Sequence, residues 1–207
     1  MNGRHEGIPD ENNRRIHALY YAKITHLDDL FGEILAAYER RGWLDDALIV
    51  HWSDHGEMLC DHGRFHKSVF FNGSLNIVMN VRWPGRIEGG RVCDSLVETI
   101  DAFPTILEAV GAPPSERCQG RSLWPCLREA SAEVRDAAFS EIHDTSMVMT
   151  RRHKYAVDSQ GRGYMLYDLE KDPKEMRNLI GAPRTEAVER ELRDRLLRFY
   201  LSAQVKF

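Results

Sequence analysis

A carboxylate and an imidazole stand side by side in residues 53–57, which read Ser-Asp-His-Gly-Glu. Asp54 supplies a hard charged oxygen and His55 a nitrogen, a mixed pair that suits a divalent metal. Residues 61–67 follow with further polar and cationic groups and end in Lys67, whose ammonium can bind the oxygens of a sulfate or phosphate. Gly56 is expected to relieve the steric constraint on the turn between them. The pattern indicates a loop that binds a metal and an anion.

Other interpretations of the same residues stay open. An isolated Asp-His-Gly is more often a turn than a metal site. His51 and His55 have a zinc-like spacing, but that spacing requires a helix and this segment has the pattern of a strand, so zinc is not expected. Arg64 could contact a substrate or pair with Glu57. Three further residues fit a solvated loop as well as a site, namely Asp61, His62 and His66, and Cys60 is read as an ordinary small residue.

The elements that must position this loop have an α/β pattern. Apolar residues at steps of three and four predict a long amphipathic helix over 14–41, closed by Gly42. The run at 47–52 is short and β-branched and predicts a buried strand, so the loop at 53–66 lies at its carboxyl end, where open α/β sheets bind ligands. A helix followed by such a strand favours a parallel sheet. A further strand is predicted over 75–83 and a helix over 94–110, interrupted near Pro104.

The carboxy-terminal part has a different pattern. Short strands at 138–142, 147–150, 155–157 and 164–168, separated by turns, predict a small antiparallel sheet, and a final helix is predicted over 185–201. The run Arg151-Arg152-His153-Lys154 is interpreted as a solvated strand–turn face. The expected organisation is an α/β domain over 1–133 followed by a small α+β subdomain over 134–207.

The composition is typical of a soluble globular protein, with 43% hydrophobic and 29% charged residues. A net charge of −4 gives no electrostatic reason to expect nucleic acid or an anionic membrane as a partner. No apolar run is long enough to span a bilayer, and residues 1–7 lack the apolar core of a signal peptide. The four cysteines form no C-x-x-C pair and are predicted to be reduced thiols of a cytoplasmic protein. The oligomeric state stays open, and an oligomer is compatible with the sequence.

Several segments together resemble the second half of a sulfatase, in order and from about residue 16 to about residue 180. The most specific are Ser-Asp-His-Gly-Glu-Met-Leu-x-Asp-His-Gly at 53–63, His-Lys-Ser-x-Phe-Phe-x-Gly-Ser at 66–74, Val-Arg-Trp-Pro-Gly at 81–85, Asp-Ala-Phe-Pro-Thr-Ile-Leu at 101–107, Gln-Gly-Arg-Ser-Leu at 119–123 and Leu-Tyr-Asp-Leu-Glu-x-Asp-Pro-x-Glu-x-x-Asn-Leu at 166–179.

This resemblance implies part of an alkaline-phosphatase-like sheet with helices on both faces, and one divalent cation at its strand ends: Ca²⁺, or else Mn²⁺ or Mg²⁺. Asp54 and His55 match two metal ligands, and a histidine at the second position resembles the choline-sulfatase and phosphonate-monoester-hydrolase branch. Lys67 matches a catalytic lysine that contacts the sulfate group and the leaving-group oxygen, and His66 and Arg64 are further candidates for substrate binding. The implied substrate is a small-molecule sulfate ester.

The sequence departs from the family at the nucleophile. In sulfatases this is a cysteine oxidised to formylglycine within C-x-P-x-R. Residues 60–64, Cys-Asp-His-Gly-Arg, have the arginine at the right offset but neither Pro nor Ala between it and the cysteine. The remaining aspartate ligands also have no counterpart. The expected function is therefore a truncated sulfuric ester hydrolase; the alternatives are a phosphonate or phosphodiester hydrolase on the same scaffold and a non-catalytic remnant. Truncation of the sheet is expected to expose apolar surface, so that the isolated chain aggregates or needs a partner.

Overall fold

The structure is a computed structural model that describes residues 9–203. The chain separates into two compact units, one that ends at Gly90 and one that begins at Arg91. The domain boundary predicted after residue 133 does not fall at this division and stays a prediction. Within 9–203, no helix is both long and apolar enough to cross a membrane.

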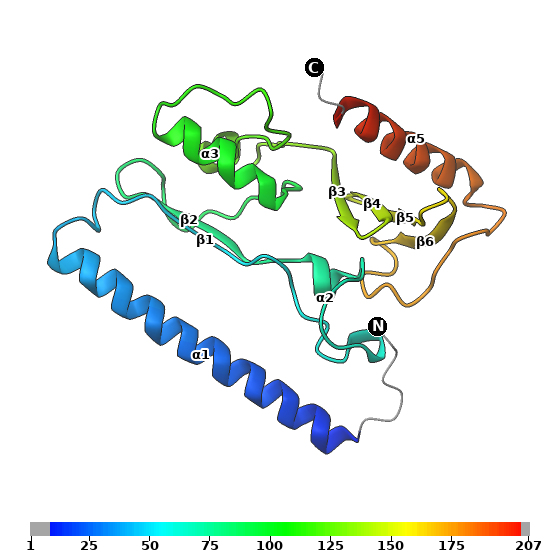
Figure 1. Cartoon of the computed structure of the whole chain (residues 1–207), viewed down its shortest axis with the longest axis horizontal. Coiled ribbons are helices and arrows are strands. Elements are labelled where there is room, and N and C mark those ends of the chain that lie inside the picture. Colours follow the sequence, from blue (N-terminus) through cyan, green and yellow to red (C-terminus); the bar gives the residue numbers. More distant parts are fainter. Residues whose placement is uncertain (1–8, 204–207) are drawn as a thin grey trace. The chain divides into compact units, whose positions relative to one another are not determined.

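The first unit begins with α1 (Asp10–Arg40), a helix of 31 residues (Figure 1). Gly42, with a φ of 69°, ends it: the Gly42 N–H donates to the Glu39 carbonyl (2.9 Å) and the Trp43 N–H to the Tyr38 carbonyl (3.1 Å). This pair of bonds is the Schellman arrangement, in which a left-handed glycine caps the last carbonyls. The rings of Tyr38 and Trp43 meet edge to face at 5.8 Å and complete the cap. The helix predicted over 14–41 is confirmed.

The apolar face of α1 is uncovered. No residue of the helix is buried, and several of its large apolar side chains are between 42% and 63% exposed: Leu19, Tyr21, Ile24, Leu27, Leu30, Ile34 and Tyr38. A row of this length is typical of a helix face that packs against another element. The exposed apolar surface expected from the sequence is therefore present.

Two short strands complete the first unit, β1 (Ile49–Trp52) and β2 (Met79–Arg82). They pair antiparallel, with Val50 opposite Val81. The expectation of a buried strand in a parallel sheet is wrong for the described residues, since β1 is half-buried at Ile49 and Val50 and exposed at His51 and Trp52. The chain returns from β1 to β2 through a loop that contains a 3₁₀ turn, η1 (Asp61–Gly63), and one α-helical turn, α2 (Asn72–Leu75). It does not return through a crossover helix, so β2 runs in the opposite direction.

The second unit begins with a 3₁₀ turn, η2 (Thr99–Asp101), that leads into α3 (Ala102–Ala109). The helix predicted over 94–110 therefore begins later than expected, at Ala102. Pro104 does not interrupt it, because Pro104 lies in the first turn, where the backbone N–H that proline lacks would have no partner within the helix. Gly120 lies against η2, where a Cβ would be 2.2 Å from the Ile100 carbonyl oxygen. The short helix α4 (Trp124–Arg128) follows, with Leu123 and Trp124 buried.

A four-stranded antiparallel sheet forms the rest of this unit, in the order β3 (Ala137–Ile142), β4 (Thr145–Thr150), β5 (His153–Val157) and β6 (Gly163–Asp168). Helix α5 (Glu186–Ala203) packs against it (Figure 1). The shared core consists of Ala137, Val148, Tyr155, Val157, Leu166, Leu192 and Leu196. The predicted sheet and final helix are confirmed, so the fold is a mixed α/β fold with small antiparallel sheets.

The strand–turn residues 151–154 correct one interpretation of the sequence. Arg151 and Arg152 lie at the surface, where Arg152 pairs with Asp168 (3.1 Å). Lys154, however, is completely buried and forms an ion pair with Glu175, which is 2% exposed. The prediction of a solvated face is therefore wrong for Lys154, which lies on the face of β5 opposite Tyr155, where the buried Glu175 compensates its charge.

Acidification is expected to destabilise the second unit through His153. Burial is the main cause that lowers the pKa of His153 below its ordinary value, Arg152 lowers it further, and the Asp168 carboxylate partly opposes this. The unfolded chain then binds more protons between that lowered pKa and about 6.5, so stability falls as the pH drops through this range. Urea unfolding at pH 7.5 and pH 5.5 should show a larger loss for the unaltered chain than for His153→Gln, and equal losses would contradict the expectation.

Candidate active site

The loop after β1 is held by backbone hydrogen bonds to the segment that precedes β2. The Ser53 N–H donates to the Val78 carbonyl (3.3 Å), the Gly56 N–H to the Ser74 carbonyl (2.8 Å). Two apolar side chains of the loop are buried, Met58 at 0% and Phe70 at 1% exposure. The loop that carries the candidate residues is therefore an ordered part of the first unit, with a small apolar anchor of its own.

Asp54, His55 and Lys67 are brought together by this loop. Lys67 Nζ lies 2.7 Å from His55 Nε2, and Asp54 Oδ2 lies 3.4 Å from the same nitrogen. His55 Nδ1 is 2.8 Å from the Gly56 carbonyl oxygen, so the ring donates its Nδ1–H there and Nε2 carries the lone pair. A histidine held in this way presents Nε2 as a hydrogen-bond acceptor or as a metal ligand.

The donors fit a divalent cation in kind but not in number. Asp54, with its side chain 85% exposed, offers a carboxylate oxygen, and His55 offers Nε2. Ca²⁺ takes six to eight oxygen ligands and Mg²⁺ about six. Within the described chain, no group of three or more His, Cys, Asp or Glu side chains could hold a metal ion. These residues therefore supply part of a metal site and do not complete one.

Gly56 has a different role from the one the sequence suggested. Its φ is not in the left-handed range; instead, a Cβ at this position would lie 2.1 Å from the Gly73 carbonyl oxygen and 2.9 Å from that of Asn76. Both atoms are backbone and cannot rotate away. Gly56 is needed because two backbone segments approach closely at the end of β1, next to the candidate site.

Gly56→Ala is expected to destabilise the first unit by about 1–3 kcal/mol, because the added methyl group pushes the α2 segment away from the loop. Gly32→Ala is a control of opposite sign, since Gly32 lies inside α1 with nothing within 4 Å of its Cβ position and alanine favours a helix by about 0.5–1 kcal/mol. Urea unfolding of both variants checks the two signs, and a Gly56→Ala chain as stable as the unaltered one would contradict the close approach.

Glu57 organises the other side of the loop, a role that the sequence did not single out. Its Oε1 accepts hydrogen bonds from the backbone N–H of His66 (2.5 Å) and of Leu59 (3.4 Å). His66 is exposed, and its carbonyl accepts from Met58 (3.0 Å). Substrate binding by His66 and Arg64 stays a prediction. The sequence offered one indication of this role. Glu57 lies in the turn directly after Asp54, His55 and Gly56, where a carboxylate can accept hydrogen bonds from backbone N–H groups.

Backbone strain is concentrated in this loop. Non-glycine residues with positive φ between 43° and 75° follow one another closely: Leu59, Cys60, His62, His66 and Ser68. Each such residue costs on the order of 1–3 kcal/mol, and clusters of them occur at binding and catalytic sites, where surrounding contacts enforce the geometry. The strain therefore marks the loop as a candidate site on evidence independent of the side chains.

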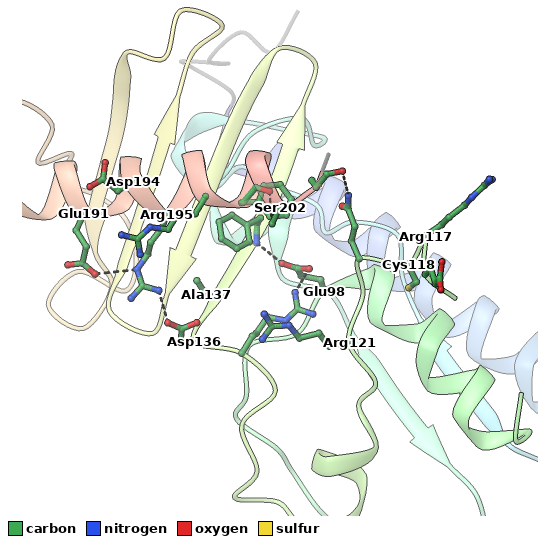
Figure 2. Close-up of a pocket in the computed structure, with 17 residues that line it drawn as sticks. Glu98, Arg117, Cys118, Arg121, Asp136, Ala137, Glu191, Asp194, Arg195 and Ser202 are labelled. Carbon is green, nitrogen blue, oxygen red and sulfur yellow. Dashed lines mark hydrogen bonds and ion pairs between the residues drawn. The ribbon is translucent and has the colours of Figure 1, made fainter. Parts of the chain in front are cut away.

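A cavity of about 1300 Å³ lies in the second unit and contains none of these residues. Five basic and five acidic side chains line it, the basic ones being Arg117, Arg121, Arg135, Arg195 and Arg198, and the acidic ones Glu98, Glu116, Asp136, Glu191 and Asp194. Arg195 bridges Asp136 (2.6 Å) and Glu191 (3.2 Å), as Figure 2 shows, and its hydrogen bond is the main cause that lowers the pKa of Asp136. The lining charges balance, so the cavity does not favour a sulfate or phosphate ion.

Known proteins match nearly the whole chain. The family model "Sulfatase" matches residues 3–112, and the model "N-sulphoglucosamine sulphohydrolase, C-terminal" matches residues 60–201. An arylsulfatase of Clostridium perfringens is 32% identical over 176 residues, which are 82% of this chain and 37% of that protein. The chain thus spans less than two fifths of the length of this relative.

Solved structures agree. The phosphonate monoester hydrolase of Silicibacter pomeroyi superposes with a TM-score of 0.87 and 28% identity, over 95% of this chain and 43% of its own. A protein solved with its substrate D-glucosamine-2-N,6-O-disulfate superposes with a TM-score of 0.80 and 26% identity. The superposition covers 89% of this chain and 40% of that protein. With two family models that each match more than half of its residues, the chain belongs to the sulfatase family of the alkaline phosphatase superfamily.

Proposed function

We propose that this chain supplies the metal- and sulfate-binding part of the active site of a sulfuric ester hydrolase. The observation that carries the proposal is the convergence of Lys67 Nζ and Asp54 Oδ2 on His55 Nε2, at 2.7 Å and 3.4 Å, in a strained loop of a sulfatase-family chain. A cation, an imidazole and a carboxylate in contact are the groups needed to bind a metal and an anion next to each other.

In this proposal Asp54 and His55 hold a divalent cation, Ca²⁺ first, with Mn²⁺ and Mg²⁺ as alternatives. When bound, such a cation polarises sulfate oxygens and neutralises their charge. The hydrogen bond from His55 Nδ1 to the Gly56 carbonyl fixes the orientation of the ring, so that Nε2 faces Lys67 and Asp54. Lys67 donates to the sulfate group or to the departing alkoxide, where negative charge develops, and His66 and Arg64 add contacts to the ester.

The nucleophile and the remaining ligands are proposed to come from sulfatase residues outside this sequence. The length comparison supports this, since the aligned residues are 37% of the Clostridium perfringens arylsulfatase. The uncovered face of α1 also supports it: Ile24, Leu27 and Ile34 are 47%, 63% and 55% exposed, and this face could pack against the further residues. The proposed substrate is a small-molecule sulfate ester.

The DNA upstream of the Met1 codon tests this part of the proposal. An in-frame segment that encodes an Asp-Asp strand end and a C-x-P-x-R motif would supply the nucleophile and support a working sulfatase. Stop codons or unrelated sequence would contradict a complete enzyme and favour the remnant, in which Asp54, His55 and Lys67 are left from a site that is no longer assembled.

A phosphonate monoester hydrolase is the second candidate, favoured by the superposition on the Silicibacter pomeroyi enzyme of that class. Both reactions need a cation and a lysine around a tetrahedral oxyanion, so the residues of this chain serve either. Turnover of an aryl sulfate and of an aryl phosphonate monoester by an assembled enzyme separates the two. We expect the sulfate to be preferred, and preference for the phosphonate would overturn the sulfatase assignment.

A further inference from the structure

Two cysteines that lie far apart in the sequence meet in the second unit. Cys93 belongs to the extended segment before η2, and Cys126 lies in α4. Their Sγ atoms are 3.5 Å and 3.4 Å from the same acceptor, the carbonyl oxygen of Ala132. After burial, Cys93 is the neighbour that contributes most to raising the pKa of Cys126. Because both sulfurs lie against the same oxygen, they are no more than 6.9 Å apart, the sum of the two distances.

The other two cysteines have no such arrangement. The Cys118 thiol donates a hydrogen bond to the carbonyl of Gly120, two residues away (3.9 Å). The Cys60 thiol donates a hydrogen bond to the side-chain oxygen of Asn13. Cys126 is 7% exposed and Cys93 is half-buried. A reagent in solution therefore reaches Cys93 before it reaches Cys126, and Cys126 is the nearest thiol that can react with a modified Cys93.

We propose that Cys93 and Cys126 form a disulfide that fastens the segment before η2 to α4. The sequence separation of the pair means that the bond closes a long loop, which restricts the unfolded chain and stabilises the folded one. It would also hold Glu98, five residues after Cys93, in place beside its ion-pair partner Arg135.

The oxidant we name is a small disulfide such as oxidised glutathione. The Cys93 thiolate attacks one glutathione sulfur, the glutathione S–S bond breaks, and the first glutathione leaves as a thiolate. Cys126 then loses its proton, and its sulfur attacks the Cys93 sulfur of the mixed disulfide and releases the second glutathione. Two cysteine thiols are oxidised, and one glutathione disulfide is reduced to two thiols.

The second step sets the pH dependence of the reaction. Burial, with a further contribution from Cys93, raises the pKa of Cys126 to about 12, while the Ser95 hydroxyl opposes the shift. Because the attacking species is the thiolate, ring closure should accelerate about tenfold per pH unit below that value. We therefore expect the bond to form faster at alkaline pH than at neutral pH.

Intact mass and peptide mapping of the full chain after treatment with oxidised glutathione at about pH 8.5 test the proposal. We expect a product lighter by about 2 Da and a linked pair of peptides that contain Cys93 and Cys126. The melting temperature should rise by on the order of 5–10 °C and return on reduction. Cys126→Ser should stop at glutathionylated Cys93, and the control Cys60→Ser/Cys118→Ser should still form the link.

The peptide map of the unaltered chain decides the matter even if a variant fails to fold. A linkage between Cys93 and Cys126 supports the proposal. Four thiols that remain reduced after oxidation, or a linkage that involves Cys60 or Cys118, would overturn it.

Discussion

Arg135→Ala is expected to lower the free energy of unfolding of the second unit by about 3–5 kcal/mol. The Arg135 side chain is 5% exposed and forms ion pairs with two carboxylates. The side chain of Glu98 is 11% exposed, and that of Asp101 is 0% exposed. Its removal leaves two buried carboxylates without the charge that compensates them. They keep only backbone donors, among them the Arg121 N–H to Asp101 (2.7 Å) and the Phe139 N–H to Glu98 (2.7 Å).

Urea unfolding followed by circular dichroism measures this loss. Arg151→Ala is the matched control, because its ion pair with Glu133 (2.8 Å) is more than half exposed and should contribute about 0–1 kcal/mol. Arg135→Lys should fall between the two, since a lysine keeps the charge but cannot bridge both carboxylates. Equal stability of Arg135→Ala and Arg151→Ala would show that the ion pairs of Arg135 with Glu98 and Asp101 do not stabilise the second unit.

Lys67→Ala is expected to reduce kcat by about 10²–10³-fold in a sulfatase assembled with this chain. The Lys67 ammonium lies next to His55 Nε2, and its loss removes the cation that is proposed to bind the sulfate group. Initial rates on 4-nitrophenyl sulfate measure the effect. Because the interaction strengthens as charge develops on the leaving oxygen, kcat should fall more than KM rises.

Two variants control for this effect. Lys174→Ala removes an exposed lysine of the second unit and should leave the rate unchanged. Lys67→Arg keeps the positive charge and should recover part of the lost rate. A Lys67→Ala enzyme within a factor of two or so of the unaltered one would remove Lys67 from the proposed mechanism.

Local patterns predicted most of the secondary structure. Strands β3 to β6 and helix α5 were found from the alternation of apolar residues, from turn residues and from a four-residue repeat, all of which depend on neighbours in the sequence. Helix α1 was found in the same way. The position of Asp54 and His55 at the end of a strand also followed from the sequence, because a short β-branched run precedes them.

Features that depend on distant partners were not predictable. The antiparallel pairing of β1 with β2 depends on the path of the intervening chain, and the burial of Lys154 depends on Glu175, a residue of another segment. Asp101 entered only as part of a resemblance, yet it is completely buried and binds Arg135 and two backbone N–H groups. A motif shared with a family can thus be structural as well as functional.

The most direct test of the central claim is a chimera in which this chain replaces the aligned segment of the Clostridium perfringens arylsulfatase. The remainder of that enzyme supplies what this sequence lacks, and aryl-sulfate hydrolysis with Ca²⁺ is the readout. If Asp54, His55 and Lys67 form the metal- and sulfate-binding part of the site, the chimera hydrolyses the ester and Asp54→Asn reduces the rate to background. A folded chimera whose rate is unaffected by Asp54→Asn would contradict that claim.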